Sequence, residues 1–342
     1  MSVITGQISI TKWGTGEVKN SWLCRDYEKG DEYQILSLYR QVSGREMSLA
    51  FWRWRYLENP FGQGMIKLLF DGDKLIGHRG AIPMVVSVQE MPLPAALILN
   101  TLTHPDFRRF GVSTYLAAAL YDEAAQRGIK FVYNFPNPNS YPLYLRIKDW
   151  RVLDQRSVYQ KRLESQSTSR IRKNSNIYQV EEFDEGVNAL WDRVEQDYHV
   201  IVPRTKEFLN WRFVKNPAIV YYKYAFISSQ REVLGYIVLK TYLDEYGTKG
   251  HIIDMLSIED TGIVKELLEC ADDHFRRSKI QHISCWMPEH SFYADIFKRE
   301  GYTRESMETH FGLRILDKQD SLLRQVEHIR HWYLTMGDSD VF

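Results

Sequence analysis

The 342-residue sequence has few cysteines, and none of them is paired at metal-binding spacing. Cys24, Cys270 and Cys285 are an odd number without a Cys-x-x-Cys pair, which argues against a disulfide framework and a zinc ribbon and favours a reducing compartment. No run reaches the ~18 apolar residues of a membrane-spanning helix, and no basic segment followed by an apolar run opens the sequence. We therefore expect a soluble, cytoplasmic protein, for which peripheral association with membrane-bound partners stays open.

An excess of charge of either sign is also missing. Lysine plus arginine equal aspartate plus glutamate at 44 each, so no overall field attracts nucleic acid or a membrane, and any anion site must be local. The 9 tryptophans and 21 tyrosines can fill a core or offer flat platforms for sugars and adenine, and we expect core packing for most. The length predicts two domains of about 150 residues each.

One strand, loop and helix organise the first half of the sequence. The apolar run that begins at Ala96 predicts a strand, which Pro105 ends. Residues 106–111, Asp-Phe-Arg-Arg-Phe-Gly, then lead into a helical pattern that ends at Gly128. Because the first N–H groups of a helix lack internal partners, a basic loop with glycine at this place can bind a phosphate. An ordinary surface turn with two solvated arginines fits the same residues equally well.

The loop resembles a known motif. Arg108-x-x-Gly111-x-Ser113 is similar to the Gln/Arg-x-x-Gly-x-Gly/Ala pyrophosphate loop of the GNAT N-acetyltransferase superfamily, with serine in place of the last small residue. Other segments extend the resemblance: Thr103-His104-Pro105 is similar to the end of the family's fourth strand, and residues 130–135 and 137–144 resemble its next strand and a short helix bearing an Asn and a Tyr. Asp149-Trp150 stands, at altered spacing, where the family usually has Gly-Phe.

A self-comparison indicates that the fold is present twice. Residues 51–60 and 208–217 both read Phe-x-x-Trp-Arg-aromatic-x-x-Asn-Pro, at an offset of 211 − 54 = 157. For these copied residues we favour a packing role, with Asn-Pro ending a helix. Each copy precedes a pair of strands, and in the first copy an Asp-Gly turn at 71–73 predicts a hairpin from 65 to 82. The resemblance implies an α/β (α+β) protein of two tandem GNAT-like domains, each a mixed, mostly antiparallel sheet flanked by helices.

The polar segment Gln160–Asn176 marks the boundary between the copies. We divide the chain into an N-terminal domain with the acyl-CoA site (1–163), a linker (164–176), a degenerate C-terminal GNAT-like domain (177–318) and a tail (319–342). The remaining expected elements are these: a strand or a loose arm in 1–20, strands at 22–25, 177–183, 221–228, 233–242 and 251–258, helices near 33–39, at 49–57, at 185–198, from 204 and after 262, a helix-to-strand turn at 297–302, and a tail helix from Ser321 to Leu334 capped by Asp320.

The second copy lacks the basic loop. Glu259 and Asp260 stand where the first copy has arginines, and an acidic loop repels a diphosphate. We expect this half to have lost coenzyme binding and to shape the substrate cleft or hold a partner. His328-x-x-His331 lies on one helical turn without a third ligand, so a solvated face is the favoured interpretation and we expect no metal.

The resemblance implies transfer of an acyl group, most simply acetyl from acetyl-CoA as cosubstrate, to an amine. The amine must lose its proton, the thioester oxygen needs stabilisation, and the leaving thiolate gains from a proton. The expected catalytic residues are Tyr144 as acid, with Tyr141 as runner-up, and His104 and His78 as bases, for which a solvent-facing and a structural role also fit. The expected coenzyme-binding residues are Leu102, Thr103, Arg108, Arg109, Phe110, Gly111, Val112, Ser113, Thr114, Asn137 and Tyr144, and the expected substrate-binding residues are Trp54, Arg55, Tyr56 and Arg79.

The substrate is indicated by a looser resemblance. The Trp-Arg-Tyr-x-x-Asn-Pro element, the doubled fold and residues 332–340 are similar to bacterial acetyltransferases of surface polysaccharide biosynthesis, which implies a small-molecule amine, a nucleotide- or lipid-linked amino sugar, and no nucleic acid as partner. Two other functions stay open. A tandem transferase that uses aminoacyl-tRNA would lack the coenzyme loop and show a basic groove. A non-catalytic acyl-CoA sensor or scaffold would bind the coenzyme without transferring its acyl group.

Overall fold

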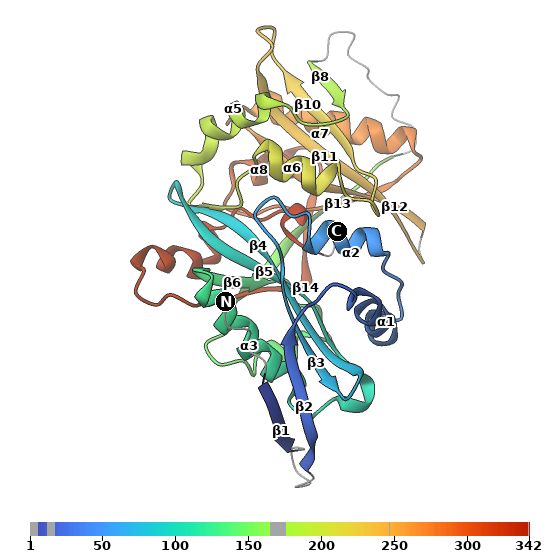
Figure 1. The fold of residues 1–342 in the computed structure, drawn as a ribbon. Helices are drawn as coiled ribbons and strands as arrows, with labels where there is room; N and C mark the ends of the chain where they lie inside the picture. Colours follow the sequence, from blue (N-terminus) through green and yellow to red (C-terminus); the bar gives the residue numbers. More distant parts are fainter. Residues whose placement is uncertain (1–5, 12–17, 165–175, 246, 341) are drawn as a thin grey trace.

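The strands of both halves join into one continuous sheet. The structure is a computed structural model that describes residues 6–11, 18–164, 176–245, 247–340 and 342. The sheet order is β1-β2-β3-β4-β5-β6-β14-β7-β13-β12-β11-β10-β8, and β9 pairs with β4. Figure 1 shows the two halves one above the other, with β1 to β3 at one end and β8 and β10 at the other. Helices flank the mixed sheet portion of each half, which confirms the predicted fold class.

The bounds are as follows. The strands are β1 (Gly6–Thr11), β2 (Val18–Asp26), β3 (Met65–Asp71), β4 (Lys74–Val88), β5 (Met91–Thr103), β6 (Phe131–Asn134), β7 (Arg151–Arg162), β8 (Ile177–Val180), β9 (Val200–Ile201), β10 (Tyr222–Ile227), β11 (Val233–Asp244), β12 (Gly247–Ser257), β13 (His282–Trp286) and β14 (Thr303–Ile315). The helices are α1 (Glu32–Ser43), α2 (Leu49–Tyr56), α3 (Val112–Gln126), α4 (Tyr141–Tyr144), α5 (Glu185–Val194), α6 (Lys206–Phe213), α7 (Thr261–Arg277) and α8 (Phe292–Arg299).

In the first half, the helices cover the two faces of the sheet separately. Ile35 of α1 and the aromatic residues of α2 belong to the large core that extends into the second half. Leu120 of α3 packs instead in a smaller core with Ile98 of β5 and Ile147 after α4. Side chains alternate along β4, so neighbouring residues lie on opposite faces of the sheet. The predicted hairpin between β3 and β4 is confirmed, with Gly72 in the turn at φ 57°.

Two strands are exchanged between the halves. β14, from the second half, lies between β6 and β7, and β7, from the first half, lies between β14 and β13. Gln160 of β7 illustrates the sharing, because Thr303 pairs with it on one side and Ser284 on the other. Each half therefore completes the sheet of the other. Most of the segment proposed as a linker (165–175) lies outside the described residues, so the domain boundary stays a prediction.

The copied motif forms a second contact between the halves. The rings of Trp54 and Trp211 stack with centroids 4.9 Å apart at 19°. The Trp54 indole Nε1 donates to the Trp211 carbonyl oxygen at 2.8 Å, and the Trp211 indole Nε1 donates to that of Trp54 at 3.2 Å. Asn59 Oδ1 and Asn216 Oδ1 each accept from the backbone N–H two residues on. The packing role predicted for the copied tryptophans is confirmed.

The predicted tail helix is wrong. Residues Ser321–Glu327 and Ile329–His331 form short 3₁₀ turns, separated by His328 in an extended conformation. Trp332 explains the difference: it is fully buried, and its indole N–H donates to the Val326 carbonyl oxygen at 2.8 Å, which a continuous helix would not allow. The apolar spacing therefore reflects burial of a folded-back segment. Asp320 does cap the first turn, since its Oδ1 accepts from the Leu322 N–H at 3.0 Å.

Other boundaries differ by a few residues. Leading residues 6–11 form β1, so a strand replaces the alternative of a loose arm there, while residues 1–5 lie outside the described part. The expected helix at 185–198 ends at Val194 and continues as a 3₁₀ turn, Glu195–Asp197. Strand β8 ends at Val180 rather than 183, and β11 continues to Asp244.

Candidate active site

The N-terminus of α3 has the geometry of a phosphate site. Gly111 stands before the helix in the left-handed region at φ 79°, and no side chain caps this end. A Cβ at this position would meet nothing within 4 Å, so the approach is open. Arg109 is also left-handed at φ 67°, and both it and Arg108 are exposed. Phe110 anchors the loop by packing against Trp22 at 6.1 Å between centroids. The free amides of Val112–Thr114 and two nearby cations suit a diphosphate.

Next to this loop, β5 has an open edge. It pairs in parallel with β6 only from Ala95 to Leu97, although β5 continues to Thr103. A bulge interrupts its pairing with β4 where Asn100 adopts φ 50°. Across the described part of the chain, no strand pairs with residues 98–103 on the β6 side. Leu102 and Thr103 lie on this edge, where main-chain groups can bind an extended amide-bearing arm.

His104 links this edge to the loop, and its side chain acts locally. Its Nδ1 accepts from the Asp106 N–H at 3.3 Å, which caps the 3₁₀ turn Pro105–Phe107. The same nitrogen lies 3.6 Å from the Asp106 carboxylate, with which it can pair only when the ring is protonated. This placement favours a structural role over that of a base.

Tyr144 lies across the opening from β5. It is buried, and its hydroxyl is 3.5 Å from the Thr101 hydroxyl. Arg79, on the same face, donates to the Tyr121 hydroxyl at 2.8 Å, with its guanidinium carbon 5.4 Å from the ring centres of Tyr121 and Tyr144. Tyr141, the runner-up, instead stacks on His310 of β14 at 3.6 Å. The exposed Asn137 caps the turn before α4, accepting from the Ser140 N–H at 2.9 Å.

The other predicted substrate residues gather on the opposite face, around the bulge. His78 Nδ1 is 2.7 Å from the Asn100 carbonyl oxygen. Because that oxygen can only accept, Nδ1 holds the proton, and the buried Nε2 has no partner. Arg55 donates to Asn100 Oδ1 at 3.2 Å, and the fully buried Tyr56 lies edge-on to His78 at 6.1 Å. The structure thus separates Arg79 from Arg55 and Tyr56.

Burial sets the charge of His78. Desolvation lowers its pKa from 6.5 to about 4, so the ring is neutral at pH 7. As pH falls, the imidazole of His78 is therefore protonated in the unfolded chain before it is protonated in the folded protein. The contribution of the neutral ring to the free energy of unfolding is complete above pH ~6.5 and is lost as pH falls toward 4. We expect this loss to reach about 3 kcal/mol at pH 4. Urea unfolding of wild type and His78→Asn from pH 7 to pH 4 checks it.

His251 serves as the internal reference for that experiment. Desolvation lowers its pKa to about 3, so it destabilises both proteins similarly as pH falls. The difference between the two pH profiles then isolates His78. Parallel profiles would contradict a buried, neutral His78.

The chain's last described residues fill the interface between the halves. A cavity of about 30 Å³, room for roughly one water molecule, remains where residues 337–340 lie against Trp54 and Trp211. Arg212 donates to the carbonyl oxygens of Gly337 at 3.1 Å and Ser339 at 3.0 Å, and Arg55 donates to that of Asp340 at 3.3 Å. The copied arginines therefore hold one segment from two sides.

A buried charge network secures this segment to the second half. Arg204 has no exposed surface and donates to both oxygens of Asp254 at 3.1 Å and of Asp338 at 2.8 Å. It also donates to the Thr335 hydroxyl at 3.2 Å and the Val202 carbonyl oxygen at 2.8 Å. The sequence did not predict the buried network of Arg204 or the contacts of Arg212 with the tail. The repeat does give Arg212 the position equivalent to that of Arg55.

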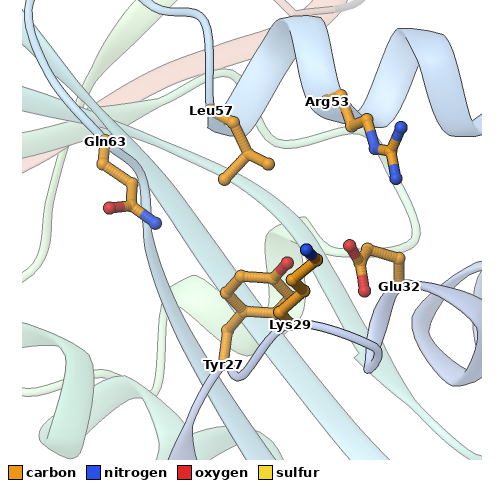
Figure 2. Close-up of a pocket in the computed structure, with 6 residues that line it drawn as sticks. All are labelled: Tyr27, Lys29, Glu32, Arg53, Leu57 and Gln63. Atoms are coloured by element: carbon orange, nitrogen blue, oxygen red, sulfur yellow. The ribbon is translucent and has the colours of Figure 1, made fainter.

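A separate pocket of about 600 Å³ opens beside α1 and α2. Its lining comprises Tyr27, Lys29, Glu32, Arg53, Leu57 and Gln63 (Figure 2). Burial raises the pKa of Glu32, but its hydrogen bonds, including one from the Gly30 N–H, and the charge of Arg53 outweigh this and lower it. None of the predicted site residues lines this pocket.

The second half closes both features that are open in the first. Asp260 caps α7, and its Oδ1 accepts from the N–H groups of Gly262 at 2.7 Å and Ile263 at 3.1 Å. Beyond its short pairing with β13, β12 meets Tyr293, whose hydroxyl accepts from the Ser257 N–H at 3.0 Å and donates to the Ser257 carbonyl oxygen at 3.1 Å. A carboxylate and a phenol thus lie at the helix end and the strand edge that correspond to the open ones of the first half.

The described residues contain no group of three His, Cys, Asp or Glu side chains arranged to hold a metal ion. Among them, no helix combines the length and the apolar character needed to cross a membrane. The rings of His328 and His331 lie 5.1 Å apart on adjoining turns.

Comparison with known proteins identifies the first half. Residues 24–153 match the sequence model of the family described as "Acetyltransferase (GNAT) domain". This segment, which is less than half of the chain, is similar to a GNAT acetyltransferase domain. The match spans β2 through the start of β7 and includes the Gly111 loop, the open edge of β5 and Tyr144. The GNAT fold binds acyl-CoA, and the uncapped α3 with its neighbouring open edge fits that molecule. No curated protein matches the sequence.

Solved structures extend the likeness beyond the GNAT domain. A GCN5-related N-acetyltransferase from Anabaena variabilis is 15% identical with a TM-score of 0.65, covering 86% of this chain and 73% of its own. A probable N-acyltransferase of unknown function from Enterococcus faecalis is 15% identical with a TM-score of 0.67, covering 86% and 72%. Saccharomyces cerevisiae N-myristoyltransferase with bound myristoyl-CoA is 13% identical with a TM-score of 0.59, covering 92% and 85%. At these identities the likeness shows the fold alone. The GNAT match of residues 24–153 is what supports an acyltransferase.

Proposed function

We propose that this protein is an acetyl-CoA-dependent N-acyltransferase whose acceptor is an amino sugar of bacterial surface polysaccharide biosynthesis. The observation that carries the proposal is the uncapped, glycine-led N-terminus of α3 beside the open edge of β5, set against the capped and closed counterparts in the second half. The acceptor class is supported by the resemblance of the Trp-Arg-Tyr-x-x-Asn-Pro element at residues 54–60 to such acetyltransferases.

The residues of the first half take the following parts. The amides of residues 112–114 and the guanidinium groups of Arg108 and Arg109 bind the diphosphate. Main-chain groups of Leu102 and Thr103 hold the amide-bearing arm. When bound, the coenzyme supplies the thioester. Tyr144, at the end of that edge, donates its hydroxyl proton to the departing sulfur.

The acceptor amine approaches from the opposite face, at the bulge of β5. His78 Nε2 is unprotonated and has no partner there, so it can accept the proton that the amine loses. Its lowered pKa makes it a weak base at neutral pH. Arg55 and Asn100 offer hydrogen-bonding groups beside it for sugar hydroxyls.

Acyl-transfer assays test the proposal. Purified protein is incubated with acetyl-CoA and a panel of free, nucleotide-linked and lipid-linked amino sugars, and released thiol and acetylated product are both measured. Myristoyl-CoA serves as a second donor, because one structural neighbour holds it. Faster acetyl than myristoyl transfer to an amino sugar is expected. Binding of acetyl-CoA without transfer to any acceptor would contradict the enzymatic proposal and favour a sensor.

Tyr144→Phe is expected to lower kcat by about 100-fold while KM for acetyl-CoA changes little, because the phenol contributes its proton as the C–S bond breaks. Steady-state kinetics at saturating acceptor measures both constants. Tyr141→Phe is the matched control, since Tyr141 begins the same short helix but stacks on His310. An unchanged kcat in Tyr144→Phe together with a reduced kcat in Tyr141→Phe would reassign the acid to Tyr141.

A further inference from the structure

Arg79 is a buried cation without a counter-ion. It has no exposed surface, and its guanidinium donates a hydrogen bond to the Tyr121 hydroxyl at 2.8 Å. Nε and Nη1 have no hydrogen-bond partner, and within the described residues no carboxylate lies at ion-pair distance. Two other buried cations are paired with carboxylates: Lys67 with Asp26 and Glu123, and Arg204 with two aspartates. The buried Arg212 donates instead to carbonyl oxygens.

Burying the charged guanidinium of Arg79 without a counter-ion costs free energy, yet the group remains charged. An unpaired ion loses hydration that nothing on the protein replaces. Burial acts to lower the pKa of Arg79, but the neighbouring phenols of Tyr121 and Tyr144 outweigh it and raise the pKa. The guanidinium therefore stays protonated at neutral pH.

The position of Arg79 points to an anion that forms during the reaction. It lies on β4 opposite the bulge of β5, between Tyr121 of α3 and Tyr144 of α4. Tyr144 in turn reaches Thr101 on the open edge. Arg314 of β14 also lies over the Tyr121 ring, at 4.8 Å, but unlike Arg79 it makes no such contact with the Tyr144 ring. Acyl transfer generates a thiolate on the coenzyme. The Arg79 guanidinium is a buried positive charge next to Tyr144, the residue proposed to contact that thiolate.

We propose that Arg79 is a positioning residue that stabilises the departing coenzyme thiolate through Tyr144, an inference that rests on the proposed acyl transfer. In that step the C–N bond forms and the C–S bond breaks, with the electron pair of the C–S bond passing to sulfur. Tyr144 gives its hydroxyl proton to sulfur and becomes a phenolate, which the Arg79 cation stabilises and solvent then reprotonates. The amine's proton passes to the base on the opposite face. Arg79 remains protonated throughout.

The ionisation of free coenzyme A on the protein tests the inference without turnover. The thiol of bound coenzyme A is titrated by its ultraviolet thiolate absorbance. In wild type we expect its pKa to lie ~1–3 units below that of the unbound thiol, the range for an opposite charge nearby. Arg79→Gln should remove most of this shift, and Arg79→Lys should keep part of it. The affinity for the desulfo analogue of coenzyme A should stay the same in all three proteins.

Arg314→Gln is the matched control, because Arg314 contacts the same Tyr121 ring but not that of Tyr144; its bound thiol should titrate as in wild type. If Arg79→Gln does not fold, Tyr144→Phe takes its place and should also remove the shift. A wild-type thiol pKa equal to or above that of the free coenzyme would overturn the role of Arg79 while leaving coenzyme binding intact. Absence of coenzyme A binding to wild type would instead overturn the proposed function.

Discussion

Gly111→Val is expected to weaken acetyl-CoA binding by at least about 100-fold. Gly111 has a left-handed backbone at φ 79°, where a β-branched residue costs roughly 1–2 kcal/mol. Relief of that strain moves the loop and withdraws the amides from the diphosphate. The loss of two hydrogen bonds from amides to the diphosphate, at ~1.5 kcal/mol each, corresponds to a loss of affinity of about 100-fold. Isothermal titration calorimetry of the purified variant with acetyl-CoA measures the loss.

Gly128→Val separates binding from strain. Gly128 follows the other end of α3 at φ 78°, and a Cβ there also meets nothing within 4 Å. Both variants should therefore lose similar stability in urea unfolding, while only Gly111→Val loses affinity. Equal affinities in the two variants would show that the turn before α3 does not hold the coenzyme.

Arg204→Ala is expected to lower the free energy of unfolding by about 3–5 kcal/mol. Removal of the guanidinium leaves the Asp254 and Asp338 carboxylates buried without a cation, which is the costly way to break a buried ion pair. It also frees residues 335–338 from the second half. Urea unfolding at pH 7, followed by circular dichroism, measures the loss.

Lys206→Ala is the matched control for Arg204. It lies two residues away and pairs with Glu185 at 2.7 Å, but both side chains are exposed, so the expected loss is below ~1 kcal/mol. A similarly small loss in Arg204→Ala would mean that the network does not fix the tail to the second half.

Local signals were sufficient for much of the first half. The Asp-Gly turn predicted the β3–β4 hairpin, and the two glycines at 111 and 128 bracketed α3 to within a residue or two. These features depend on neighbouring residues, because a left-handed turn residue is nearly always glycine. The acidic Asp260 likewise indicated that the second half would not bind a diphosphate, and the structure places its carboxylate on the helix N-terminus.

Contacts between distant residues could not be predicted in this way. Strands β7 and β14 pair with each other although they lie about 150 residues apart in the sequence. Neither strand carries a sequence pattern that indicates which strand it pairs with. The four partners of Arg204 come from β12, the tail and the segment before α6, so only the fold assembles them. Arg79 was expected to bind the acceptor, whereas alternation along β4 places it with Tyr121 and Tyr144 on the α3 face. The spacing of Leu323, Val326 and Trp332 suggested a helix because burial of a folded-back segment repeats at similar intervals.

A crystal structure of the protein grown with acetyl-CoA tests the central claim most directly. The account predicts one coenzyme per chain, its diphosphate on the amides of residues 112–114, its arm along residues 101–103, its sulfur beside the Tyr144 hydroxyl, and nothing at the Asp260-capped end of α7. A diphosphate bound elsewhere, or a coenzyme seated in the second half, would contradict it.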